Sequence, residues 1–270
     1  MAEAVSRDVA GEPWVPRGVR LLDVDPELAA ELEGDELVQA SEHAIVPKLR
    51  FDPGPWGPER LADERGVRGD AHGFLLLAGA VTIDVSMMGR SCTRLITPGE
   101  LVLLDGRETD SIPLRWGWSV LEPATVAVLD DRLLAIGRRW PTLMAAILRR
   151  GAQQLRHALL QQAISQLPRV EDRLLGLIWS IADRQGVVRG DGIWVHLPVT
   201  HDTLAHMVGA RRSTVSLGLT KLAHKGLLTP EAGGWLIDRA SLDRFEFPGV
   251  DRLIQSVVPP LTGSKPASTG

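Results

Sequence analysis

The residues best suited to chemistry in this 270-residue chain lie within residues 199–228. Arginine carries a planar fork of N–H donors that fits phosphate oxygens and the acceptor edge of guanine, and hydroxyl side chains donate to the same acceptors. Residues 203–230 contain four basic side chains and no acidic one, which indicates an anionic partner; a solvated helix face is the alternative. The candidate contact residues are Thr200, Arg211, Arg212, Ser213, Thr214, Ser216, Leu217, Thr220 and Lys225.

The pattern around these side chains predicts two helices joined by a tight turn. Thr200 is a candidate N-cap for a helix over residues 201–208. Gly209 stands where that helix must stop and the chain must turn sharply, a position that favours glycine. A second helix is expected over residues 211–224, with polar side chains facing outward from its N-terminal half. Its buried stripe would be Val215, Leu219 and Leu222.

A β-hairpin is expected directly after the second helix. Residues 227–229 and 235–237 flank the turn sequence of residues 230–234, which indicates the wing of a winged helix. Arg212 is placed to read guanine and Leu217 a thymine methyl group, while Arg211 and Lys225 would contact phosphates. The sequence therefore predicts a DNA-binding transcription regulator. The competing class is a ligand- or protein-binding module whose winged helix mediates protein interactions.

Charge divides the chain into two halves, although its net charge is only −4. Residues 1–130 hold 12 basic and 23 acidic side chains, a difference of −11, whereas residues 131–270 hold 18 and 11, a difference of +7. This asymmetry predicts two domains with different partners. A single cysteine, Cys92, excludes an internal disulfide, and no secretion signal or membrane span is evident, so we expect a cytoplasmic protein.

Short apolar runs separated by turn residues predict a small antiparallel β-barrel or sandwich in the N-terminal half, and with the later helices an α+β fold. The expected strands are residues 73–77, 79–85, 101–104, 116–121 and 125–129, with loops over 51–70 and 105–113. A short helix is expected over 26–33, with Asp25 as its N-cap. Trp116 and Trp118 alternate along one strand, so they face the same side and could line an effector pocket with Arg115; a core role is the alternative.

Residues 131–167 predict a long helix, with Pro141 at a first-turn position. Apolar and small residues recur at heptad spacing along it, which favours pairing with a second copy of the same helix. Packing of an amphipathic helix on its own domain is the alternative. The expected dimer contacts are Leu148, Ala152, Leu155, Leu159 and Gln162.

With these features the chain resembles the CRP/FNR family, the catabolite activator type of bacterial regulator. The most specific part is LAHMVGARRSTV at residues 204–215, which is similar to the family's helix-turn-helix signature, and residues 73–85 resemble part of its cyclic-nucleotide-binding-like roll. The resemblance implies a homodimer on a palindromic double-stranded DNA site, RNA polymerase as a further partner and a small-molecule effector in the roll. It also places Glu100, after Gly99, at a turn of that roll.

Several positions depart from the family pattern. Ser213 stands where family members often have Glu, and Leu217 where they have a second Arg, so the best-known family half-site is not implied. No Arg-Ser pair follows the Gly-Glu turn, and Ala158 and Leu159 replace the Thr-Ser pair that holds adenine, which argues against cyclic AMP in the usual mode. A binder that needs no ligand is the alternative. The effector-pocket candidates are Glu100, Arg115, Trp116 and Trp118.

No enzyme activity, metal site or cofactor is predicted. The histidines at 196, 201, 206 and 224 do not form a consistent i, i+4 pair, and no thiol or acid completes a ligand set. We find no nucleophile–base pairing and no Gly-rich phosphate loop. The expected division is a flexible arm over residues 1–20, the β-roll over 21–130, a dimerisation helix over 131–167, a winged-helix DNA-binding domain over 168–248 and a tail over 249–270.

Overall fold

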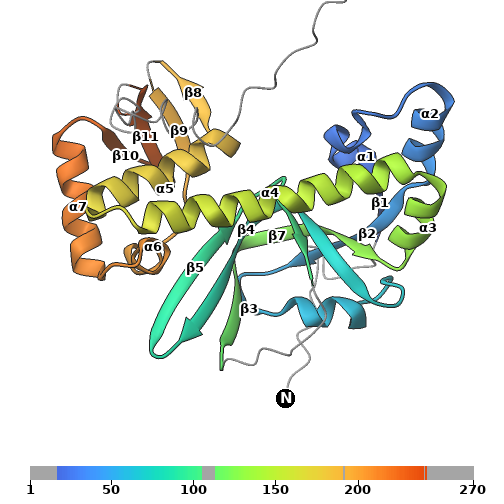
Figure 1. The fold of residues 1–270 in the computed structure, drawn as a ribbon, viewed down its shortest axis with the longest axis horizontal. Helices are drawn as coiled ribbons and strands as arrows, with labels where there is room; N and C mark the ends of the chain where they lie inside the picture. The colour runs from blue at the N-terminus through green and yellow to red at the C-terminus, as the bar shows by residue number, and fades with distance from the viewer. Residues whose placement is uncertain (1–16, 105–112, 191, 240, 242–270) are drawn as a thin grey trace, which may run out of the picture.

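The computed structural model describes residues 17–104, 113–190, 192–239 and 241. Its N-terminal half is a seven-stranded antiparallel sheet with strand order β1-β2-β7-β4-β5, in which β3 pairs with β7 and β6 with β4 (Figure 1). This sheet confirms the predicted β-roll. Its strands are β1 (Arg17–Arg20), β2 (Ile45–Phe51), β3 (Gly54–Trp56), β4 (Ala71–Met87), β5 (Arg90–Ile96), β6 (Leu101–Leu103) and β7 (Arg115–Asp130).

Two long strands, β4 and β7, form the centre of the roll. The segments 73–77 and 79–85, expected as two strands, form one continuous strand β4 that bends at Gly79. Gly79 has a φ of +87°, and a Cβ built there would lie 2.4 Å from the carbonyl oxygen of Pro123. Only glycine allows the two backbones to approach so closely. The bend lets the inner face close around a core that includes Phe74, Leu76 and Val126, all fully buried.

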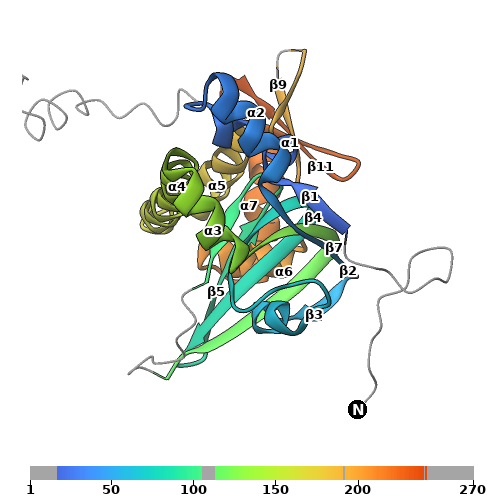
Figure 2. The same cartoon turned by 90° about the vertical axis from the view of Figure 1, so that its right-hand side faces the viewer.

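Helices cover the end of the roll at which β1 lies. A second core forms where Leu75 and Leu129 of the sheet meet Leu143 and Ile147 of a long helix, α4. Figure 2 shows α3 and α4 on one side of the strands of the roll. This helix runs along the molecule from α1–α3 to α5–α7 (Figure 1). The helices of this half are α1 (Leu21–Val24), η1 (Pro26–Ala29), α2 (Gly34–His43), α3 (Arg132–Arg139) and α4 (Pro141–Ser165).

The predicted single helix over residues 131–167 is in fact two helices, α3 and α4. Proline has no N–H to continue the hydrogen-bond ladder, so Pro141 begins α4 at its first position. Trp140 leaves the helical conformation at φ −127° and ψ 80°, yet its side chain is only 4% exposed. The break therefore turns the chain while keeping the tryptophan in the core.

The C-terminal half is a winged helix, as predicted. Three helices, α5 (Val170–Gln185), α6 (His201–Val208) and α7 (Arg212–His224), pack around a core that includes Leu174, Ile178 and Leu204. Ala80 and Leu95 of the roll join the same core, so the two halves share buried surface. A four-stranded sheet with order β10-β11-β9-β8 completes this half: β8 (Val187–Arg189), β9 (Gly192–His196), β10 (Leu228–Glu231) and β11 (Gly234–Asp238).

Several local predictions were wrong. Residues 17–20, expected in the flexible arm, form β1, and the expected loop over 51–70 contains β3 and the 3-10 helix η2 (Pro58–Asp63). The helix expected over 26–33 is only the short η1, and the Asp25 side chain caps nothing because it pairs with Arg150. The sequence reading missed β2, β5, β8 and α2. The rest of the arm, residues 105–112 of the expected loop and the tail lie outside the described residues.

Candidate nucleic-acid interface

The first helix of the motif, α6, is fixed at both ends by the residues that the sequence singled out. The Thr200 hydroxyl accepts a hydrogen bond from the Thr203 N–H at 3.1 Å, so it satisfies one of the free donors of the first turn. Gly209 ends the helix in the left-handed conformation at φ 64° and ψ 42°. Both predictions are confirmed.

The second helix, α7, has one buried and one exposed face. Val215, Leu219 and Leu222 are at most 3% exposed, as predicted. Gly218 completes this face, because a Cβ there would lie 2.9 Å from Leu174 of α5 and the helices therefore pack closely. Leu217 is 55% exposed on the opposite side. The other exposed candidates are Arg211, Arg212, Ser213, Thr214 and Thr220.

The Ser216 hydroxyl has partners on both helices of the motif. It lies 3.1 Å from the Arg212 carbonyl oxygen and 2.9 Å from Nδ1 of His201. The side chain is half-buried between the two helices. No pattern in the sequence marked the His201 contact, because that contact depends on how α6 crosses α7.

Arg173 is another residue that the sequence reading missed. It lies on α5, and its guanidinium donates to the Val208 carbonyl oxygen at 3.2 Å. That carbonyl belongs to the last turn of α6, where helix carbonyls lack intrahelical partners. Arg173 therefore ties the turn of the motif to α5.

The basic surface of α7 is partly neutralised. Lys221 Nζ lies 2.8 Å from Glu171 Oε1 on α5. The hydrogen bond from Lys221 lowers the pKa of Glu171, so this acid is ionised at neutral pH. Lys225, at the C-terminal end of α7, is exposed. Of the four basic residues in the acid-free window, Arg211, Arg212 and Lys225 are therefore the better candidates for phosphate or base contacts.

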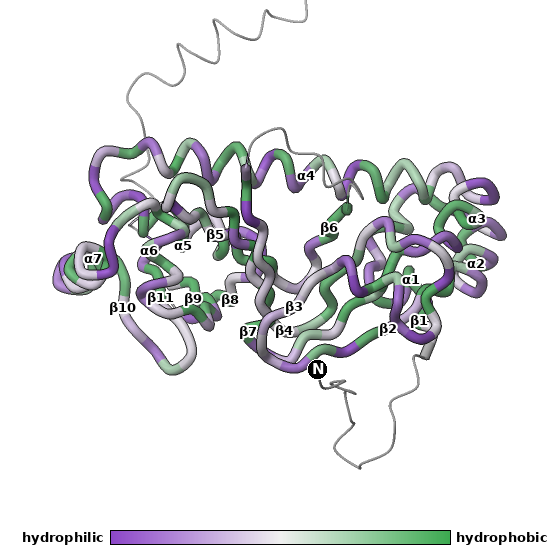
Figure 3. The backbone as a smooth tube through the Cα atoms, turned by 90° about the horizontal axis from the view of Figure 1, so that it is seen from below, coloured by the Kyte–Doolittle hydropathy of each residue, from purple (hydrophilic) through white to green (hydrophobic). Residues whose placement is uncertain are grey.

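The expected dimer contacts lie on the outward face of α4. Leu148, Leu155 and Leu159 are 60%, 65% and 56% exposed in the protomer. Ala152 and Gln162 are exposed on the same helix. Hydrophobic and hydrophilic segments alternate along α4 at the outer edge of the molecule (Figure 3). The helix therefore has an apolar stripe that its own protomer does not cover.

The four effector-pocket candidates do not come together. Glu100 is buried where its backbone bonds to that of Leu76, whereas Arg115 pairs with Ser86 at the other end of β4. Trp116 is 59% exposed beside this end. Trp118 packs in the roll core, with its ring 5.7 Å from that of Trp56 and 6.2 Å from that of Phe74.

The described residues contain no group of three or more potential metal-binding His, Cys, Asp or Glu side chains. None of the helices in those residues combines the length and apolar character needed to cross a membrane.

Residues 169–245 match the family model of the Crp-like helix-turn-helix domain. The C-terminal domain is a Crp-like helix-turn-helix domain. This match covers α5–α7 and the wing, the same segment in which the exposed polar face of α7 lies. The Crp-like domain therefore contains all the predicted DNA-contacting residues.

Solved structures extend the likeness beyond the Crp-like domain to the whole fold. A cyclic nucleotide-binding domain containing protein from Listeria monocytogenes is 15% identical, with a TM-score of 0.59 over 81% of this chain and 98% of that chain. FixK2 from Bradyrhizobium japonicum is 15% identical, with a TM-score of 0.56 over 73% and 94%. A CRP family transcriptional regulator from Thermus thermophilus is 23% identical, with a TM-score of 0.53 over 73% and 95%. No curated protein matches the chain.

These comparisons confirm the resemblance drawn from the sequence. The chain joins a Crp-like domain to a cyclic-nucleotide-binding-like β-roll, the architecture of a CRP/FNR-type transcription regulator. At these identities the solved structures establish the fold of the chain.

Proposed function

We propose that the chain binds a specific palindromic DNA sequence as a homodimer and regulates transcription from it. The observation that carries the proposal is the two-sided character of α7. Its apolar residues are buried, and its arginine and hydroxyl side chains project from the N-terminal half, which is the part of a recognition helix that reaches base edges.

The exposed residues divide by the chemistry of their side chains. Arg212 would make a forked contact with guanine, Ser213 would bond a neighbouring base edge and Leu217 would pack on a thymine methyl group. Ser216 would adjust base choice from its position beside His201. Arg211, Lys225, Thr200, Thr214 and Thr220 would fix the register through phosphates.

The apolar stripe on α4 supports the proposed homodimer. Pairing this stripe with its copy would bury Leu148, Leu155 and Leu159 and set the spacing of the two α7 helices. Successive major grooves on one side of DNA lie about 34 Å apart, so a small change along α4 would alter binding. We assign residues 131–167 to dimerisation, 21–130 to sensing and 168–248 to DNA binding, with RNA polymerase as a further partner inside the cell.

The test is selection from random DNA duplexes with the purified chain, the Arg212→Ala variant and the Arg138→Ala variant. Arg138 is exposed on α3, away from the interface, and serves as the matched control. We expect an enriched palindrome with wild type and with Arg138→Ala. Arg212→Ala should weaken binding by about 1–3 kcal/mol and relax one base position in each half-site.

Salt dependence separates this function from a protein-interaction role of the winged helix. DNA affinity should fall steeply between low and high salt, because phosphate contacts release counterions. Replacing Lys225 by Ala should reduce that slope without changing the selected sequence. If selection enriches nothing in the presence or absence of cell metabolites, and affinity for DNA is independent of salt, the proposed function is wrong.

A further inference from the structure

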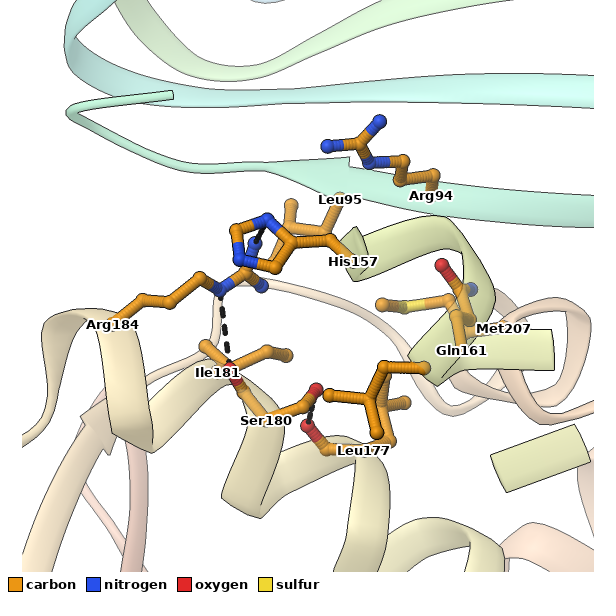
Figure 4. Close-up of a pocket in the computed structure, with 10 residues that line it drawn as sticks. Arg94, Leu95, His157, Gln161, Leu177, Ser180, Ile181, Arg184 and Met207 are labelled. Carbon is orange, nitrogen blue, oxygen red and sulfur yellow. Dashed lines mark hydrogen bonds between the residues drawn. The ribbon is translucent and has the colours of Figure 1, made fainter. Parts of the chain in front are cut away.

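The roll, α4 and α5 meet at a buried cluster of ionic side chains. Glu100, in the turn between β5 and β6, is 8% exposed. Its carboxylate contacts Arg184 of α5, lies 3.6 Å from Nη2 of Arg94 on β5 and lies 3.5 Å from Nδ1 of His157 on α4. Figure 4 shows the three basic side chains converging from these separate elements. We refer to Arg94, Glu100, His157 and Arg184 as the junction cluster.

Positive charge exceeds negative charge within the junction cluster. Two guanidinium groups face one carboxylate, and the exposed Asp183 adds only a weaker attraction to Arg184. Burial lowers the pKa of Arg184, in part offset by Glu100, because removing a cation from water is costly. Burial raises the pKa of Glu100, but His157, Arg184, Arg94 and the Thr97 N–H together lower it overall. The carboxylate is therefore ionised and still does not balance the local charge.

The same region has hydrogen-bond donors without acceptors. Nη2 of Arg94 and Nε2 of Gln154 are buried with no hydrogen-bond partner among the described residues. Gln154 lies one turn before His157 on α4. The Thr97 hydroxyl is buried without a partner as well, next to the backbone N–H that donates to Glu100. Unsatisfied buried donors are costly and rare, so the Nη2 atom of Arg94, which lines the cavity at this junction, indicates a missing acceptor.

A small cavity opens at this junction. Its volume is about 20 Å³, and its walls include Arg94, His157, Gln161 and Arg184. One water needs about 10–15 Å³ on this scale, so the cavity admits a group of only a few atoms. Excess positive charge, free N–H donors and this size together specify a small anion. Guanidinium forks match two oxygens of a planar oxyanion better than a single spherical ion.

We propose that the junction cluster is a binding site for a small planar oxyanion of the carboxylate or nitrate type. The anion accepts hydrogen bonds from Arg94 and competes with Glu100 for Arg184. Because Glu100 belongs to the roll and Arg184 to α5, occupancy changes the contact that holds the winged helix against the roll. The effect of the anion on the winged helix rests on the proposed function, whereas binding of the anion to the junction cluster does not.

Binding is tested on the full chain without DNA by thermal unfolding. The chain is titrated with potassium nitrate and, separately, with potassium formate, at an ionic strength held constant with potassium chloride. We expect a saturable rise in the unfolding midpoint for nitrate, formate or both. Arg94→Gln should raise the half-saturating concentration at least tenfold, while Arg90→Gln, an exposed arginine on the same strand, should change it less than twofold.

A second variant keeps the test decisive if Arg94→Gln does not fold. Arg94→Lys keeps the positive charge beside Glu100 but loses the planar guanidinium fork, so it should fold and raise the half-saturating concentration at least threefold. A midpoint that does not change when nitrate or formate replaces chloride, or a response unchanged by both variants, overturns the site. The consequence is tested by DNA affinity with and without saturating anion; equal affinities overturn the switching role and leave the binding site intact.

Discussion

Thr200 contributes to stability through the hydrogen bonds of its hydroxyl with the N–H and the hydroxyl of Thr203 at the start of α6. Removing its hydroxyl in Thr200→Ala leaves the Thr203 N–H without its acceptor. We expect the free energy of unfolding to fall by about 1 kcal/mol, the usual cost of losing an N-cap. Urea unfolding of the variant measures this, with Thr229→Ala on the exposed wing as the control. Equal losses in the two variants would contradict a capping role.

Residue-level predictions succeeded where a side chain's role depends on its own helix. The exposure of Arg212 and Leu217 and the burial of Val215 follow from helical periodicity alone. The partners of Ser216 and Lys221 did not follow, because His201 and Glu171 reach them from other helices. Contacts between elements depend on packing geometry, which a single sequence does not specify.

At the scale of elements, the bend of β4 depends on Gly79. A methyl group there would meet the Pro123 carbonyl, and the positive φ disfavours any L-side chain. Gly79→Ala should therefore lower the free energy of unfolding by at least about 2 kcal/mol.

Gly89→Ala is the matched control for Gly79→Ala. Gly89 has a similar φ of +74°, but a Cβ there meets nothing within 4 Å. Gly89→Ala should therefore lower the free energy of unfolding only through its unfavourable positive φ, by about 1 kcal/mol. Chemical denaturation of both variants measures the difference. If Gly79→Ala costs no more than Gly89→Ala, the close approach to Pro123 is not a constraint.

Element prediction failed where the apolar signal was weak or interrupted. Strand β5 begins with Arg90, Ser91 and Cys92 and has no alternating apolar pattern, so nothing in its sequence marked it. Turn-like residues within β4 and β7 divided each strand into two expected segments, although pairing between the strands continues across irregularities in register. Pro141 was recognised as a possible helix start, but the helix before it was assigned to the same element.

At the scale of the molecule, the exposed stripe of α4 makes a direct prediction about assembly. A charge at Leu155 would be placed twice in the interface of a symmetric dimer. We expect Leu155→Glu to weaken dimerisation about 100-fold, which corresponds to about 2.7 kcal/mol. Sedimentation equilibrium measures it, and Leu134→Glu, at an exposed leucine on α3, is the control. An unchanged dimer in Leu155→Glu would place the interface elsewhere.

Glu100, at the junction of the roll and the winged helix, also makes the stability of the folded chain sensitive to acid. Its pKa is lowered in the folded chain, so its ionised form stabilises the fold above the ordinary glutamate pKa of about 4.3. This contribution is lost as the pH falls through the lowered pKa. Wild type should therefore be more stable than Glu100→Gln at pH 7, with the difference narrowing below about pH 4. Denaturation of wild type and Glu100→Gln at pH 7 and below about pH 4 measures this difference in stability. A difference that is independent of pH would contradict a stabilising role for the ionised Glu100 carboxylate.

The pairing of β4 with β7 also affects how the chain folds. Ala71 pairs with Asp130, and Lys48 of β2 pairs with Ala127, so the roll closes only through contacts between distant parts of the sequence. In the Crp-like domain the paired residues farthest apart in the sequence are Gly192 and Asp238, and β10 pairs with the next strand, as in Leu228 with Ile237. Distant contacts slow folding, so the roll should close more slowly than the winged helix. During synthesis β2 and β4 are made first, yet they must wait for Asp130 to emerge, so the domain that is translated first contains the slowest folding step.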